Sequence, residues 1–203
     1  MQIGFRHFLM GAVFLATIPS AFAEPVGNAS AVRPAVTQRG AQGAVSDLRL
    51  RDPIIRNAEL ATADRGALEV TFLDNSKLSM GPNSKVTVDQ YVYSGSGGTG
   101  QQTVRYTKGL FRFVSGSIPK KDVKIETPSV SIGIRGTIFR SSVNEDGSGS
   151  ISVEFGPAGE EYEVYVTSKS SGKVVTLRSG QKIGFDGGGV FDGIVDGQVE
   201  GCE

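Results

Sequence analysis

The stretch Ile125-Glu-Thr-Pro-Ser-Val-Ser-Ile-Gly-Ile-Arg-Gly-Thr137 contains a run, Val130 to Ile134, in which every second residue is branched and apolar. Side chains on a β-strand point alternately to opposite faces, so this run predicts a strand with one buried and one solvated face. The same alternation recurs in residues 68–72, 85–89, 151–155 and 162–166. Together these runs predict an all-β protein.

Residue groups typical of tight turns separate the runs. Glycine, asparagine and aspartate tolerate a positive φ, and proline presets the φ of the first turn residue. The separators are Asp74-Asn75, Gly81-Pro82-Asn83, Asp146-Gly147, Gly156-Pro157, Ser171-Gly172, Asp186-Gly187, Asp192-Gly193 and Asp196-Gly197. Many short strands in a single domain are therefore expected, as a closed roll, a sandwich or a short β-solenoid.

The runs and turns place this domain at residues 43–185. Before it, residues 24–42 lack clear periodicity and predict an extended leader or a first edge strand. After it, residues 186–203 form a tail rich in glycine and aspartate. The Gly/Ser-rich stretch 94–100 predicts a flexible loop within the domain, because strand-like sequence resumes at Thr103.

Residues 1–23 have the three-part pattern of a secretory signal peptide. Arg6 precedes an apolar run from Phe8 to Ile18, and Ala21-Phe22-Ala23 gives a cleavage site. The run is about half the length that a membrane-spanning helix needs. We therefore expect a soluble protein, periplasmic or secreted, with no membrane span after cleavage.

Cleavage restricts the chemistry of the mature chain. The only histidine, His7, is removed, and loss of Arg6 leaves 20 basic against 21 acidic residues, a formal charge of −1. This balance gives no general attraction to nucleic acid or anionic lipid. The one cysteine, Cys202, can form no internal disulfide, and its two readings are an intermolecular disulfide and a thiol of no consequence in a terminal tail.

Catalysis is not expected from these residues. Without histidine in the mature chain there is no Ser-His-Asp triad, and one cysteine cannot form a conventional zinc site. A pair of carboxylates of the glycosidase type stays open, with Glu160, Glu161 and Glu163 as candidates. We predict a non-enzymatic protein that needs no cofactor or metal.

Three blocks resemble the FecR-domain family in order and spacing. They are Phe72–Tyr93, Gly109-Leu-Phe-Arg-Phe-Val-Ser-Gly116 and, most specifically, Ile125–Thr137. Arg51-Asp52-Pro53 and residues 59–66 are similar to the lead-in strands, although Asn75 stands where the family usually has glycine. The resemblance covers residues 45–180.

The resemblance implies an all-β periplasmic domain that senses or binds. In the best-known members this domain is the outer part of a transmembrane regulator, which touches the signalling domain of an outer-membrane transporter and controls a sigma factor. The present chain has no cytoplasmic anti-sigma segment and no transmembrane helix, so it resembles the stand-alone exported members. We expect an envelope protein of unknown identity as its partner.

The candidate binding residues lie in the segment Gly133-Ile134-Arg135-Gly136-Thr137 and are Gly133, Arg135, Gly136 and Thr137. Flanking glycines let the backbone turn sharply, and the guanidinium of Arg135 offers five donors in a fixed geometry. Arg135 is then either a ligand for an anionic group on a partner or a brace that bonds local carbonyls or a residue such as Glu126.

The sequence contains three weaker patterns. If the protein instead binds a glycan or matrix polymer, Tyr91, Tyr93 and Tyr165 would be stacking platforms, although tyrosines at strand positions more often pack in the core or across strands. The tail 186–197 approaches a calcium-binding nonapeptide, but Asp-Gly turns explain it better. A mixed strip could suit single-stranded nucleic acid, although a strand followed by a solvated lysine turn is the simpler interpretation. The strip comprises Lys108, Phe111, Arg112, Phe113, Lys120, Lys121 and Lys124.

Overall fold

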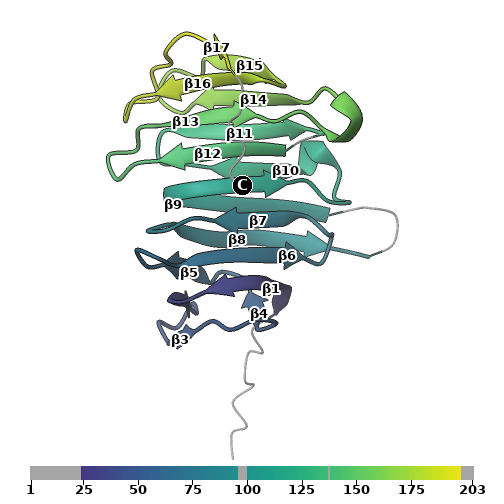
Figure 1. The fold of residues 1–203 in the computed structure, drawn as a ribbon, viewed down its shortest axis with the longest axis vertical. Coiled ribbons are helices and arrows are strands. Elements are labelled where there is room, and N and C mark those ends of the chain that lie inside the picture. The colour runs from purple at the N-terminus through teal and green to yellow at the C-terminus, as the bar shows by residue number, and fades with distance from the viewer. Residues whose placement is uncertain (1–23, 96–99, 137, 198–203) are drawn as a thin grey trace, which may run out of the picture.

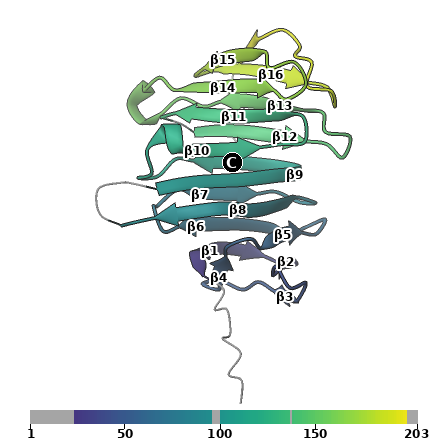
Figure 2. The same ribbon diagram turned by 180° about the vertical axis from the view of Figure 1, so that it is seen from behind.

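The computed structural model describes residues 24–95, 100–136 and 138–197. Within these ranges the chain forms seventeen strands and two short 3-10 helices, η1 (Lys120–Asp122) and η2 (Pro157–Gly159). The strands lie across the long axis of the molecule and stack along it, with N-terminal strands at one end and C-terminal strands at the other (Figures 1 and 2). The all-β prediction is confirmed.

The strands pair in two layers, here called layer A and layer B. Layer A contains, in order of pairing, β4 (Pro53–Ile55), β1 (Pro25–Arg33), β6 (Ala67–Phe72), β7 (Lys77–Met80), β9 (Gly100–Val114), β12 (Ile138–Val143), β13 (Gly149–Val153), β16 (Gln181–Phe185) and β17 (Val195–Asp196). Layer B contains β3 (Val45–Asp47), β2 (Val36–Arg39), β5 (Glu59–Thr62), β8 (Lys85–Tyr93), β9 again, β10 (Val123–Glu126), β11 (Val130–Arg135), β14 (Glu163–Ser168) and β15 (Val174–Arg178). Of the architectures left open, this arrangement is a sandwich.

Strand β9 belongs to both layers. Its first half pairs with β8 and β10, and its second half pairs with β7 and β12. The two halves meet at Gly109, whose φ of 117° is one that other residues rarely adopt. A Cβ at Gly109 would lie 2.1 Å from Oγ of Ser84, so glycine lets β9 pass close to the start of β8. The bend joins both layers into one sheet, which is not closed into a barrel.

The inward-facing side chains of the two layers form one apolar core. Phe72 of layer A stacks on Tyr91 of layer B, with ring centroids 5.6 Å apart. The alternating runs predicted from the sequence contribute to this core through β6, β8, β11, β13 and β14. Phe155 is an exception: it was expected on the buried face but is 59 % exposed, because β13 ends at Val153, ahead of Gly156-Pro157.

The segments outside the predicted domain also take part in the layers. Residues 24–42 form β1, which lies between β4 and β6, and β2, which lies between β3 and β5. Residues 186–197 form turns and the short strand β17. The predicted signal peptide 1–23 and Cys202 lie outside the described residues. No helix within the described ranges is long and apolar enough to cross a membrane.

Candidate functional site

Arg135 ends β11 on the outer face of layer B. Its side chain is 74 % exposed, and Nη1 lies 3.9 Å from Oε2 of Glu163 on the neighbouring strand β14. The other oxygen of this carboxylate, Oε1, lies 3.5 Å from Nε of Arg178 on β15, and Oε2 accepts a hydrogen bond of 3.1 Å from the Tyr165 hydroxyl. Arg135 and Arg178 therefore flank Glu163 in a row across three strands.

The contacts of Arg135 are those of a brace between strands. A hydrogen bond to the Tyr165 hydroxyl, with the charges of Tyr165 and Glu163, raises the pKa of Arg135, so the guanidinium is always positive. Glu126, the partner suggested by the sequence, instead binds Lys124 and Lys169. Arg135 therefore pairs with Glu163 and not with Glu126, because the register of β11 and β14 places Glu163 directly opposite it.

Of the two glycines in the motif, Gly136 has a backbone conformation that favours glycine and Gly133 does not. Gly136 has a φ of 60° and lies where the chain leaves β11 in layer B for β12 in layer A, so its conformation favours glycine. Gly133 lies opposite Tyr165, and a Cβ there would make an ordinary contact of 3.9 Å, so the structure gives no steric reason for glycine. Thr137 lies outside the described residues.

The basic and aromatic strip does not form one surface. Phe111 and Phe113 are buried in the core, and Arg112 lies on the outer face of layer A. Lys120 and Lys121 belong to η1, and Lys124 binds Glu126 on layer B. The strip is therefore a strand with one buried and one exposed face, followed by a lysine turn, and it does not form a groove for nucleic acid.

The tyrosines proposed as stacking platforms are placed differently from one another. Tyr91 is 2 % exposed and donates its hydroxyl to the buried carboxylate of Asp74, so it packs in the core, the commoner role of a strand tyrosine, and offers no stacking platform. The Tyr93 hydroxyl donates to the Gly95 carbonyl, and the Tyr165 hydroxyl donates to Glu163. Tyr91 is buried because it lies on the face of β8 that packs against layer A, where its ring stacks on Phe72.

The remaining candidates have local structural roles. Glu160 accepts a hydrogen bond from the Tyr162 hydroxyl, and Glu163 pairs with arginines. In the tail, Oδ1 of Asp186 accepts bonds from the amides of Gly188 and Val190, which closes a turn. Within the described ranges no three His, Cys, Asp or Glu residues are grouped so that they could hold a metal ion.

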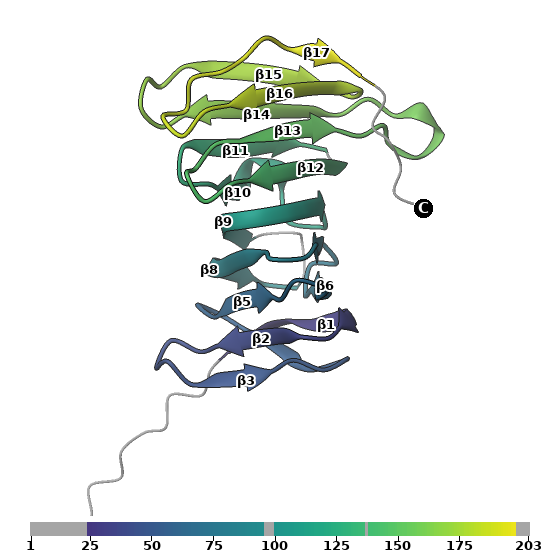
Figure 3. The same cartoon turned by 60° about the vertical axis from the view of Figure 1, so that its left-hand side comes forward.

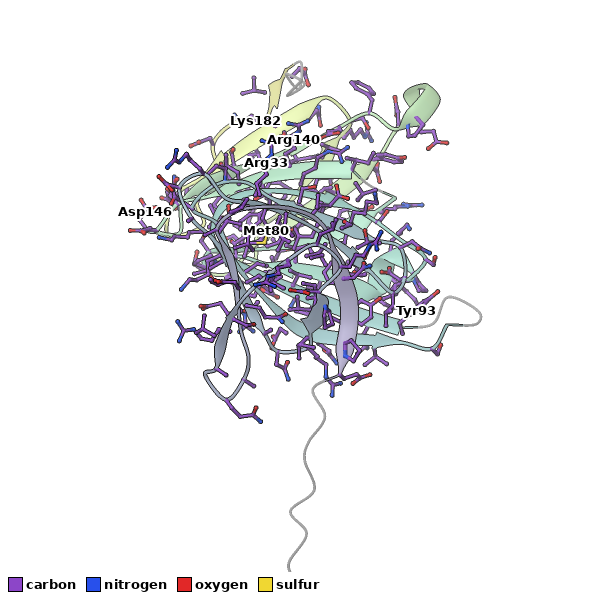
Figure 4. The ribbon with its side chains drawn as sticks, turned by 60° about the horizontal axis from the view of Figure 1, so that its bottom comes forward. Arg33, Met80, Tyr93, Arg140, Asp146 and Lys182 are labelled. Carbon is purple, nitrogen blue, oxygen red and sulfur yellow. The ribbon has the colours of Figure 1, made fainter. Side chains whose placement is uncertain are left out.

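A row of side chains on the outer face of layer A was missed by sequence reasoning. The register of β7, β9, β12, β13 and β16 aligns one residue from each strand: Ser79, Arg112, Arg140, Ser152 and Lys182. With Arg33 at the end of β1, this "layer A row" lines a hollow of about 990 Å³. Figure 4 shows Arg33, Arg140 and Lys182 gathered on one side of the molecule. The residues are far apart in the sequence, so no local pattern signals them.

Glu154 joins the two arginines of the row. Arg112 donates from Nε and Nη2 to the two carboxylate oxygens, at 2.9 Å each, and Arg140 donates from Nε to Oε1 at 2.6 Å. Burial by itself would raise the pKa of Glu154, but the hydrogen bonds and charges of the two arginines outweigh it and lower the pKa. Since like charges directly opposite each other destabilise a sheet, Glu154 is what allows these arginines to be neighbours.

The Glu154 bridge predicts a pH-dependent contribution to stability. A carboxyl whose folded pKa is lowered stabilises the fold above its unfolded pKa, about 4.3 for glutamate, and loses that contribution as the pH falls through the folded pKa. Glu154→Gln is therefore expected to cost about 2 kcal/mol near neutral pH, and this difference should shrink in acid.

Urea unfolding of the wild type and Glu154→Gln at several pH values measures the difference. Glu126, whose pKa burial would raise but Lys124 and Lys169 lower, titrates alike in both proteins and so cancels. A difference between the two proteins that stays constant down to about pH 3, below the unfolded pKa of glutamate, would contradict the role given to Glu154.

Part of the chain matches a known protein family. A family model described as FecR protein matches residues 58–158, from the start of β5 to η2. This chain carries a FecR domain. The FecR match includes the bend of β9 and the Glu154 bridge, whereas Arg33, Lys182 and β15 lie outside it.

The FecR fold also has solved relatives. Two crystal structures of a proposed anti-sigma factor from Parabacteroides distasonis ATCC 8503, at 2.50 and 1.65 Å resolution, are similar to the chain, each with a TM-score of 0.51 and 16 % identity. The similarity covers 68 % of this FecR chain and 59 % of the P. distasonis chain, and at this identity it shows a common fold. A search of curated proteins finds no match.

Proposed function

We propose that this chain is an exported, non-enzymatic sensing module of the bacterial envelope that acts by binding a protein partner. The FecR domain supports this, since its family is regulatory rather than catalytic. The structural relative from P. distasonis, described as a proposed anti-sigma factor, is consistent with such a role. The pattern of residues 1–23 supports export.

The observation that carries the proposal is the open edge of β15. Within the described ranges β15 pairs with β14 on one side only. The Ser168 amide donates to the Lys173 carbonyl at 2.9 Å, which fixes the phase of hydrogen bonding between the two strands. Backbone groups alternate along an antiparallel pair, so the amides and carbonyls of Val174 and Thr176 face away from β14. A strand from another protein can pair with them.

The other edges of the stack are less suited to strand addition. β3 and β4, at the N-terminal end, have three residues each, and β4 begins with Pro53, which has no amide to donate. On layer A, β17 has two residues. β15 has five residues, and Val174 is 56 % exposed on it. The strand lies near the C-terminal end of the stack (Figure 3). Short strands and proline protect an edge from pairing, and β15 has neither feature.

We assign Arg135 an indirect role in this binding. An acidic side chain on an added strand would meet Arg178 of β15 first, and Glu163 connects Arg178 to Arg135 on β11. Arg135 would then hold Glu163 and Arg178 in place, while the turn at Gly136 fixes the end of β11.

Replacing Thr176 with proline is expected to reduce partner binding at least about tenfold. The substitution removes one hydrogen bond to the partner's strand, and the proline ring obstructs the approach of that strand to the edge. The fold should survive, because the lost amide does not bond to β14. Thr176→Val keeps the amide and is the matched control. The measurement is cross-linking of the tagged full chain in its own envelope, followed by purification.

The proposal predicts one protein that is recovered with the wild type and Thr176→Val and is depleted with Thr176→Pro. Thermal melting of each variant verifies the fold. Equal recovery with Thr176→Pro would reject β15 as the docking edge, and recovery of no protein with the wild type would reject partner binding.

A further inference from the structure

We propose that the layer A row is a binding site for an acidic polysaccharide, a chain of sugars that carry carboxylates. The site is separate from the β15 edge, which belongs to layer B, and does not depend on it.

The charges are unusual for this molecule. Within the described ranges, Arg33 and Lys182 have no carboxylate within 4 Å, whereas every other arginine and lysine on a strand does. Both unpaired cations line the same hollow as Arg112 and Arg140, which share the single carboxylate of Glu154. Such an excess of positive charge attracts an anion, and it is concentrated on a chain that is nearly neutral.

The length of the row fits an extended ligand. Neighbouring strands lie about 4.8 Å apart, so the four steps from β7 to β16 span about 19 Å. Arg112 and Arg140 are adjacent, and Lys182 lies two strands further on, about 10 Å away by the same spacing. A polymer with repeated anionic groups can meet both points, which a small single anion cannot.

The lining combines donors for carboxylates with partners for sugar hydroxyls. Guanidinium groups match the geometry of a carboxylate. Between Arg140 and Lys182 the row holds Ser152, and the adjacent residues Ser142 and Ser150 lie with their hydroxyl oxygens 2.9 Å apart. Serine hydroxyls both donate and accept hydrogen bonds, as sugar hydroxyls do.

The lining disfavours nucleic acid. Proteins that bind single strands stack bases on exposed aromatic rings. Phe111, the aromatic residue among those that line the hollow, is 4 % exposed and has its ring in the core against Tyr106. A ligand that relies on charge and hydroxyl contacts is therefore favoured over one that relies on stacking.

The test uses a tetramer of galacturonic acid as the probe and the neutral tetramer of galactose as the reference, with binding to the full chain measured by calorimetry at low salt. The wild type should bind the acidic probe and not the neutral one. Reversing both unpaired cations, Arg33→Glu with Lys182→Glu, should weaken binding at least about tenfold. Lys121→Glu reverses one exposed charge on η1, outside the hollow, and this control variant should bind as the wild type does.

Three outcomes would overturn the proposal: equal affinity for the neutral tetramer, equal loss with Lys121→Glu, or tighter binding of a polyphosphate of matched length. Thermal melting checks that the variants are folded. If the double variant Arg33→Glu with Lys182→Glu is unfolded, the single variant Lys182→Gln is used in its place. Thr176→Pro should bind the probe normally, which separates this site from the β15 edge.

Discussion

Asp74→Ala should lower the free energy of unfolding by about 4 kcal/mol, because it leaves several buried donors without an acceptor. Asp74 is fully buried in the turn between β6 and β7. Its Oδ1 accepts hydrogen bonds from the hydroxyls of Ser76 at 2.6 Å and Tyr91 at 3.2 Å. Its Oδ2 accepts a bond of 3.4 Å from the amide of Ile118, in the connection after β9. One carboxylate thus ties together three segments that are distant in the sequence.

The Tyr91 hydroxyl is a reliable donor to this carboxylate. Burial and the neighbouring Asp74 charge raise the pKa of Tyr91, so the hydroxyl keeps its proton. Gly116 packs against the same residue, and a Cβ there would lie 2.6 Å from Oδ2 of Asp74. Asp74, Ser76 and Tyr91 are all buried, so the donors that lose Asp74 have no bulk water beside them.

Asp146 provides a matched control for Asp74. It accepts bonds from the amide and hydroxyl of Ser148, at 2.9 and 2.6 Å, as Asp74 does from Ser76, but it is exposed. Asp146→Ala should melt close to the wild type, whereas Asp74→Ala should melt about 10 °C lower. Equal melting temperatures for the two variants would show that the buried network contributes little.

The second large effect is expected from Gly109→Ala, at about 3 kcal/mol. The φ of 117° strains any side chain, and the new Cβ would lie 2.4 Å from Cα of Ser84, so the backbone of β8 or β9 must move. Because β9 connects the two layers, a shift there disturbs the pairing of both. Urea unfolding gives the free energy directly.

Gly172 is the matched control for Gly109. Its φ of 71° is also positive, but a Cβ there would meet nothing within 4 Å. Gly172→Ala should cost about 1 kcal/mol, from backbone strain alone. If Gly109→Ala costs no more than Gly172→Ala, the close passage of β9 over Ser84 does not constrain the fold.

The features that the sequence predicted are those set by local physics. Alternation alone placed Val130–Ile134 and the residues of β6, β8 and β14 on the correct faces. Turn chemistry was also predictable: Asn75, which stands where the family usually has glycine, has a φ of 65°, and asparagine tolerates it. Phe155 shows the limit, since alternation does not reveal where a strand ends.

The candidate sites show why the remainder was not predictable. The layer A row depends on the register of five strands, and Arg112, Arg140 and Lys182 are neighbours only through that register. The Asp74 network likewise joins Tyr91 and Ile118 across the fold. The glycine-flanked Arg135 was visible in the sequence, but its partner Glu163 depends on the pairing of β11 with β14.

Hydrogen exchange at the amides of Val174 and Thr176 tests the proposed strand addition at β15 most directly. In the free protein both amides should exchange quickly, because they face the open edge. The partner is the protein recovered by cross-linking. When it is bound to the full chain, both amides should become protected. The amide of Gly193, in the exposed segment after β16, serves as the unpaired reference. Protection of Val174 and Thr176 on binding is the predicted result, and a bound complex in which both amides exchange as in the free protein would contradict it.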